Sequence, residues 1–196
     1  MADVVLFHHL QGRTDGVLAF AEQLRAGGHT VHTPDLFDGA LPAGLEEGSA
    51  LTREIGDEEL DRRADRAVAE LPAGLVYAGV SFGVLAAQRL AQTRPGAHGA
   101  LLYEACLPIT GEWAIAPWPA GLAAQIHGME KDPFFGLEGD IDAARTIVEE
   151  AGPDRAQLYV YPGDVHLFTD SSLPTYDAEQ AALVVERSRQ FLDLHG

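Results

Sequence analysis

Cysteine and lysine are almost missing from this 196-residue sequence, which has one of each, Cys106 and Lys131. With a single cysteine the chain cannot form an internal disulfide, and we expect a cytoplasmic protein in a reducing compartment. No apolar run approaches the ~20 residues of a membrane-spanning helix, and the first residues lack the basic region of a signal peptide. The sequence therefore predicts a protein that does not have a membrane as a partner.

Positive charge is also scarce, with 13 basic against 30 acidic side chains and a formal net charge of -17. A chain so acidic repels the phosphates of DNA and RNA, so nucleic acid is excluded as a partner. The composition is ordinary for a globular protein, and the length suits one domain over residues 1–196. We expect a small-molecule substrate as partner and either a monomer or a homodimer.

Short apolar or β-branched runs alternate with longer amphipathic stretches along the whole chain. This alternation is typical of a mostly parallel sheet with helices on both faces, a three-layer α/β architecture. The expected strands cover residues 4–8, 29–34, 75–78, 99–104, 122–127 and 157–161. The expected helices cover residues 16–25, 57–71, 84–92, 140–151 and 176–194. The stretch 36–56 is rich in Gly, Pro and Ala, and it is expected to form an irregular loop.

Between an expected strand and an expected helix lies the motif Gly79-Val80-Ser81-Phe82-Gly83, which has the form G-x-S-x-G. A serine on a sharp strand-to-helix turn needs small neighbours, and the two glycines remove side chains that would block the turn. The turn places the serine at a helix N-terminus, where backbone N–H groups can stabilise an oxyanion. The N–H of Phe82 is one such donor. The pattern predicts that Ser81 is a nucleophile.

A serine nucleophile needs a general base, and the base needs an acid that orients it. In this architecture the acid and then the base follow the serine along the chain, at the carboxyl ends of strands. Asp132 and His166 meet both conditions, and we expect a Ser81–His166–Asp132 triad. Glu104, at the end of an earlier strand, is the alternative acid.

Further residues at the same edge of the sheet are candidates for a substrate pocket. His9 follows His8 at the end of the first strand, and either a hydrogen bond to substrate or a structural role suits it. Aromatic residues in the loops favour an apolar pocket, with loop packing as the alternative. The candidates are His9, Gln11, Glu104, Trp113, Trp118 and Phe134. The pattern His29-x-x-His32 lacks a third ligand, so no metal and no cofactor are expected.

Together these motifs resemble the dienelactone hydrolase family. The matching pieces are the turn at 79–83, His127-Gly128 followed by Asp132, Pro162-Gly163-x-x-His166-x-Phe168, and His9-Leu10-Gln11-Gly12 after the first strand. The resemblance implies an α/β-hydrolase fold with no large lid domain. It also implies acyl transfer through Ser81 on an ester or lactone, with Leu10 supplying a second backbone N–H to the oxyanion.

The sequence departs from the resemblance in ways that bear on the substrate. The best-known members have a cysteine where Ser81 stands, a glutamate where His9 stands, and an arginine shortly after the catalytic histidine. Here His166 is followed by Leu167-Phe168-Thr169-Asp170, so no cation is expected to hold a substrate carboxylate. We expect a neutral or cationic ester, lactone or amide. An acyltransferase or specialised biosynthetic enzyme, and a non-catalytic small-molecule-binding homologue, remain as alternatives.

Overall fold

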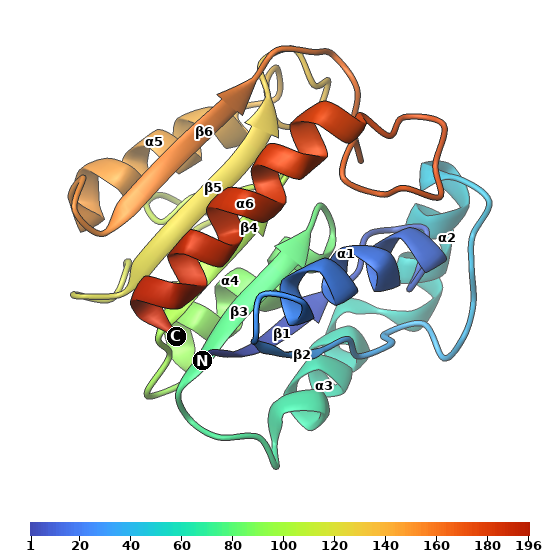
Figure 1. Cartoon of the computed structure of the whole chain (residues 1–196). Coiled ribbons are helices and arrows are strands. Elements are labelled where there is room, and N and C mark those ends of the chain that lie inside the picture. Colours follow the sequence, from blue (N-terminus) through green and yellow to red (C-terminus); the bar gives the residue numbers. More distant parts are fainter.

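The computed structural model describes residues 1–196 without a gap (Figure 1). Its strands are β1 (Asp3–Phe7), β2 (Thr30–His32), β3 (Leu75–Val80), β4 (Gly99–Tyr103), β5 (Ala123–Met129) and β6 (Ala156–Tyr161). Its helices are α1 (Asp15–Arg25), α2 (Leu45–Ile55), α3 (Asp57–Val68), α4 (Gly83–Thr93), α5 (Asp140–Ala151) and α6 (Ala178–His195). Every expected strand and helix is present, with its ends within three residues of the prediction. None of the helices has both the length and the apolar character that crossing a membrane requires.

The six strands form one sheet in the order β2-β1-β3-β4-β5-β6, and all neighbouring strands run parallel. The chain therefore moves outward from β1 to β2 and then returns past β1 to add β3 through β6 on the other side. Such a reversal of direction, here between β1 and β3, leaves a crevice at the carboxyl ends of the strands where ligands bind. The fold therefore indicates that the loops after β1 and β3 form the ligand-binding site.

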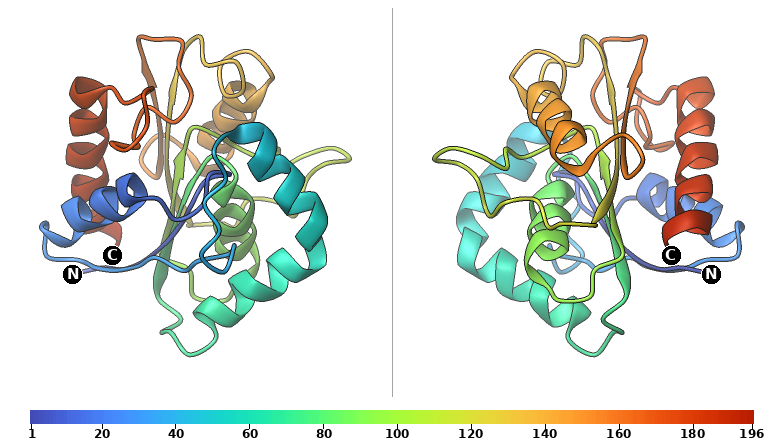
Figure 2. Two further views of the ribbon diagram at one scale, coloured as in Figure 1. Left: turned by 90° about the vertical axis from the view of Figure 1, so that its right-hand side faces the viewer. Right: turned by 90° about the vertical axis from the view of Figure 1, so that its left-hand side faces the viewer.

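Helices cover both faces of the sheet, with α1 and α6 on one side and α3, α4 and α5 on the other (Figure 2). Alternate strand residues point to opposite faces, so β1 contributes Val5 and Phe7 to one core and Val4 and Leu6 to the other. Strands β3 and β4 are buried along their whole length, as expected of strands covered on both faces. The predicted three-layer α/β architecture with helices on both faces of the sheet and no large lid domain is confirmed.

The expectation of an irregular loop over residues 36–56 is wrong, because this stretch contains α2. The helix has two acidic residues in its first turn, an arginine in its last turn, and Gly56 at its end with φ of 83°. Leu51 and Ile55, one turn apart, pack against the core. Its N-cap is Gly44, which provides no side-chain hydrogen bond, so the usual start signal is missing from the sequence.

Candidate active site

Ser81 lies on a strained turn between β3 and α4, with a φ of 50°. Positive φ is costly for a residue with a side chain, and it is common where a site needs a fixed geometry. The two flanking positions, 79 and 83, have no room for a side chain. A Cβ on Gly79 would lie 2.4 Å from the carbonyl oxygen of Gly83, and one on Gly83 would lie 2.2 Å from that of Phe7. The G-x-S-x-G motif thus forms the strand–turn–helix elbow that its sequence predicts.

A chain of hydrogen bonds links Ser81, His166 and Asp132. The distance from His166 Nε2 to Ser81 Oγ is 2.7 Å, and the distance from His166 Nδ1 to Asp132 Oδ2 is also 2.7 Å. The ionised Asp132 only accepts, so Nδ1–H donates to it and Nε2 is free to accept from the serine hydroxyl. Asp132 is fully buried, and its other oxygen accepts from the backbone N–H groups of Phe134 and Phe135. This is the Ser–His–Asp arrangement of acyl-transfer enzymes.

The surroundings of His166 favour its charged form. Burial alone would lower its pKa, but the hydrogen bond that it donates to Asp132 and the nearby carboxyl groups of Glu104, Asp132 and Asp140 raise the pKa above its ordinary value. The ring of Phe134 lies against the imidazole, with 4.7 Å between ring centroids, and covers it from one side. The imidazolium that forms when His166 accepts a proton is therefore stabilised by its neighbours.

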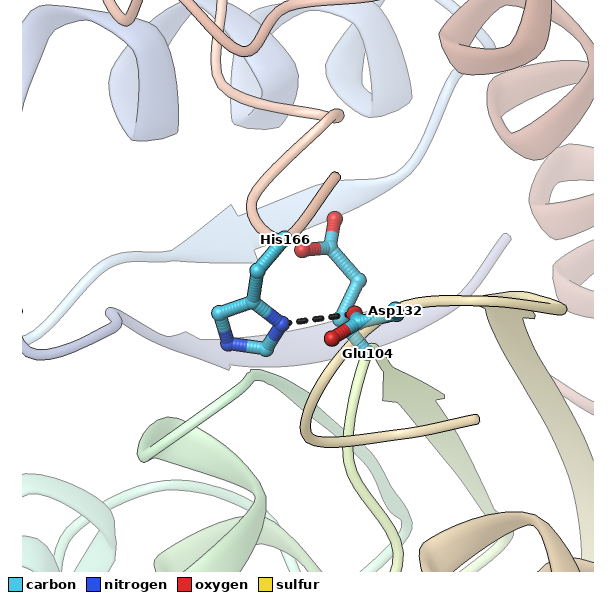
Figure 3. Close-up of side chains that lie close together, drawn as sticks. All are labelled: Glu104, Asp132 and His166. Atoms are coloured by element: carbon cyan, nitrogen blue, oxygen red, sulfur yellow. Dashed lines mark hydrogen bonds and ion pairs between the residues drawn. The ribbon is translucent and has the colours of Figure 1, made fainter. Parts of the chain in front are cut away.

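Glu104 directly follows β4 and lies beside the other acid, as Figure 3 shows. Its Oε1 accepts from the backbone N–H and the hydroxyl of Thr169, at 3.2 and 2.8 Å, while its Oε2 has no partner. Of the two acids weighed from the sequence, Asp132 is the one bonded to His166. One potential metal-ligating atom each of Glu104, Asp132 and His166 lies within 4.8 Å of the others, but His166 and Asp132 are bonded to each other. We therefore assign no metal to this cluster.

Two backbone N–H groups near Ser81 have no acceptor within the protein, those of Phe82 and Leu10. Phe82 precedes α4, so its N–H lies at a helix N-terminus, where the helix dipole favours negative charge. Leu10 lies in the loop after β1, and both residues line the same cavity as Ser81. These are the two donors that the sequence predicts for an oxyanion.

The loop that carries Leu10 is held by two fully buried histidines, His8 and His9. His9 Nε2 bonds to Asp170 at 2.7 Å, and its Nδ1 accepts from the backbone N–H of Gln11 at 3.1 Å. His8 Nδ1 donates to the carbonyl of His9 at 2.8 Å, and its Nε2 accepts from the backbone N–H of Leu36. Both rings are fully engaged, so the structure favours the structural role for His9 over a bond to substrate.

Asp170 is also bonded to the hydroxyl groups of Thr14 and Ser172. Burial alone would raise the pKa of Asp170, but the bonds from His9, Ser172 and Thr14 outweigh it and lower the pKa to about 2. Asp170 is therefore a carboxylate that ties the loop after β6 to the loop after β1.

A cavity of about 680 Å³ opens beside Ser81 and His166. Its apolar wall comes from several loops and helices, namely Leu10, Leu45, Val84, Leu85, Leu107 and Phe134. Four acidic residues also line it, Glu46, Glu104, Glu138 and Asp140, and neither a lysine nor an arginine does. A cavity of this size and character fits a small, mostly apolar ligand without negative charge.

Only some of the residues predicted to form a substrate pocket line this cavity. Glu104 and Phe134 line it, while His9, Gln11, Trp113 and Trp118 do not. Trp113 is 82% exposed, and Trp118 is buried with its indole N–H donating to the carbonyl of Leu122. Sequence reasoning missed the α2 residues Leu45, Glu46 and Ser49, because that segment was expected to be a loop. The acidic first turn before an apolar stripe was the available signal.

The dienelactone hydrolase family profile matches residues 1–195. A dienelactone hydrolase-like promiscuous phosphotriesterase from metagenomic libraries has 18% identity and a TM-score of 0.76, over 100% of this chain and 87% of its own. A dienelactone hydrolase structure from Klebsiella pneumoniae has 17% identity and a TM-score of 0.72, over 98% of this chain and 87% of its own. A thermophilic esterase from the Planctomycetes species Thermogutta terrifontis, with bound propionate, has 17% identity and a TM-score of 0.64, over 100% and 84%. No curated protein matches the chain.

At these identities the solved structures establish the fold, and the family assignment comes from the profile, which spans nearly the whole chain. The profile agrees with the resemblance drawn from the elbow and from the loops that carry Asp132 and His166. The chain belongs to the dienelactone hydrolase family and is a carboxylic ester hydrolase with an α/β-hydrolase fold.

Proposed function

We propose that this hydrolase cleaves a small ester or lactone through an acyl-enzyme on Ser81. The observation that carries the proposal is the unbroken hydrogen-bond chain from Ser81 Oγ to His166 and on to Asp132, with both bonds at 2.7 Å. Ser81 and His166 line a cavity that has room for a small substrate. Membership of a hydrolase family supports the same conclusion.

In the acylation step, Ser81 Oγ attacks the carbonyl carbon while its proton passes to His166 Nε2. The carbonyl electron pair moves onto the oxygen, and the backbone N–H groups of Phe82 and Leu10 stabilise the resulting oxyanion. When the oxyanion collapses, the bond to the leaving oxygen breaks, and that oxygen takes the proton from His166. Asp132 holds the imidazole in the required tautomer and stabilises its charged form.

In the deacylation step, water takes the place of the alcohol. His166 Nε2 accepts one proton of the water as its oxygen attacks the acyl carbon, and a second oxyanion forms in the same position. Collapse breaks the bond to Ser81 Oγ, which recovers its proton from His166. The products are a carboxylic acid and a free enzyme, and a lactone gives the corresponding hydroxy acid.

The lining of the cavity supports a neutral or cationic substrate. Four acidic side chains and no basic ones other than His166 face it, so a substrate carboxylate has no ion-pair partner there. The related esterase holds propionate in its structure, which makes short acyl esters reasonable first substrates. We therefore expect turnover of short-chain aryl esters and neutral lactones.

The test is hydrolysis of p-nitrophenyl acetate and butyrate, and of a neutral lactone, by the wild type and by Ser81→Ala. Loss of a triad serine removes most of the rate, and we expect kcat/KM to fall by ~10⁴-fold or more. A fluorophosphonate should add one equivalent to the wild type and none to the variant, as read by intact-protein mass. Equal hydrolysis by both proteins would contradict the proposal. Added alcohol or amine acceptors distinguish hydrolysis from transfer, since a transferase forms the new ester or amide.

A further inference from the structure

The mechanism above leaves one buried acid of the site unused, Glu104. It is fully buried, its Oε2 has no hydrogen-bond partner, and its φ is 63°. An unpaired buried oxygen and a left-handed backbone on a residue with a side chain both reduce stability. A glycine would avoid both costs at this position. The glutamate side chain is therefore explained by what its carboxyl does in the site.

The position of Glu104 couples it to the triad. Glu104 directly follows β4, and β4 is the strand between β3 and β5 in the sheet. Ser81 directly follows β3, and Asp132 lies in the loop after β5. Figure 3 shows the carboxyl of Glu104 beside the side chains of His166 and Asp132, and one potential metal-ligating atom of each lies within 4.8 Å of the others. Thr169, three residues after His166, holds Glu104 Oε1 through two hydrogen bonds. The carboxyl is thus fastened to the loop that carries the imidazole.

The ionisable groups that face His166 are three carboxyl groups from different elements. Asp132 approaches from the loop after β5, Glu104 from the end of β4, and Asp140 from the start of α5. Burial raises the pKa of Glu104, and the negative charge of Asp132 raises it further, while His166 and Thr169 act in the opposite direction. Glu104 therefore holds its negative charge best when His166 is an imidazolium, and the two charges stabilise each other.

Building on the proposed function, we propose that Glu104 is a second acid of this site. It is a positioning residue that stabilises the His166 imidazolium together with Asp132 and takes over part of that role when Asp132 is lost. Asp132 remains the hydrogen-bond partner of Nδ1, and Glu104 acts by its charge across a short, buried gap.

A double-mutant cycle on p-nitrophenyl butyrate tests the shared role. In a site with one acid, Asp→Asn costs ~10⁴-fold in kcat. Here we expect Asp132→Asn to cost only about 10²-fold, and adding Glu104→Gln to remove a further ~10²-fold. Glu104→Gln alone should lower kcat by roughly 3- to 10-fold and change KM less, because the His166 imidazolium that it stabilises forms only as the reaction proceeds. Identical kcat values for Asp132→Asn and the double variant would overturn the proposal.

The charge of His166 gives a readout that a purely structural role would not move. In ¹⁵N-labelled protein, the His166 signals are assigned by their loss in His166→Asn. Removal of the Glu104 charge should lower the titration midpoint of His166. Because the active form has a neutral His166, the acidic limb of the kcat/KM profile should move to lower pH as well.

Two further variants serve as control and safeguard. Asp164→Asn removes an exposed negative charge two residues before His166, and it should shift the midpoint by less than about 0.2 units because solvent screens it. Glu104→Gly removes the carboxyl and suits the positive φ, so it provides the same test if the buried glutamine prevents folding. An equal midpoint in the wild type, Glu104→Gln and Glu104→Gly would refute the role of Glu104.

The two proposals fail in distinguishable ways. If the wild type hydrolyses the ester no faster than Ser81→Ala, the proposed function fails, while the His166 titration still tests the coupling to Glu104. If Ser81 is required but neither the titration nor the double-mutant cycle responds to Glu104, only the second acid is refuted.

Discussion

At the scale of single residues, the protein contains two histidine–carboxylate pairs that serve different purposes. Both pairs, His166–Asp132 and His9–Asp170, have a 2.7 Å bond, and of the four side chains only His166 is not fully buried. The difference lies at the second ring nitrogen. That of His166 faces the hydroxyl of Ser81, whereas that of His9 accepts a backbone N–H. The first pair can move a proton, and the second holds a loop in place.

The His9–Asp170 pair gives a prediction about stability and pH. The pKa of Asp170 is lowered from 3.8 to about 2, which corresponds to about 2 kcal/mol of stability. A lowered carboxylate pKa contributes fully above the unfolded pKa, and the contribution is lost as pH falls through the folded pKa. Asp170→Asn should therefore lower the free energy of unfolding by about 2 kcal/mol at pH 7, as measured by urea denaturation.

The same measurement near pH 3 supplies the check on the sign. There the difference between the wild type and Asp170→Asn should shrink to roughly half, because the wild type has lost part of the contribution. Asp177→Asn offers a poor comparison since it caps α6, so the exposed Asp164→Asn is the control, with a change within about 0.5 kcal/mol. A gap that widens toward low pH would show that Asp170 does not act as an ionised partner.

Residue type and chain order were enough to predict which side chains meet at Ser81. A G-x-S-x-G turn requires its glycines, and parallel strands bring their carboxyl ends to one edge, so Asp132 and His166 had to lie near the serine. The pocket was harder to predict. Whether His9 faces a ligand or Asp170 depends on a partner 161 residues away, and nothing near His9 in the sequence encodes that choice.

At the scale of elements, strands and long helices followed from periodicity, and α2 did not. The sequence before and within α2 is rich in Gly and Ala, and its N-cap residue is a glycine, which has no side chain to cap the helix. What fixes α2 is a tertiary contact. A Cβ on Gly48 would lie 2.1 Å from the carbonyl oxygen of Leu10, so the helix backbone approaches the loop after β1 closely. The helix thereby closes one side of the cavity next to Leu10.

This close approach predicts the effect of Gly48→Ala. The added methyl group meets backbone atoms that cannot turn away, so the helix and the Leu10 loop must separate. We expect a loss of about 1–3 kcal/mol in unfolding free energy and a fall of roughly 10-fold in kcat/KM for p-nitrophenyl butyrate. Ala50→Ser, on the exposed side of the same helix, should leave both unchanged. Wild-type kinetics in Gly48→Ala would show that α2 does not position that loop.

At the scale of the whole molecule, the charge of the surface and that of the cavity have the same sign. The net charge of -17 produces a negative field around the protein, and the acidic residues of the cavity extend it to the site. A field of one sign raises the local concentration of oppositely charged ligands and lowers that of like-charged ones. A positively charged substrate is therefore favoured both during its approach to the protein and when it binds in the cavity.

The last prediction concerns how substrate charge affects the rate. Between two esters of equal size, one with a trimethylammonium group and one with a carboxylate, the cationic ester should have the higher kcat/KM at low salt. Raising the ionic strength should reduce the ratio of the two rates, because salt screens exposed charges beyond ~10 Å. Glu46→Gln and Glu138→Gln, at the cavity wall, should also reduce this ratio, while Glu150→Gln, an exposed residue outside the cavity, should not. Faster turnover of the carboxylate-bearing ester would contradict this reading, since the cavity presents no lysine or arginine to attract it.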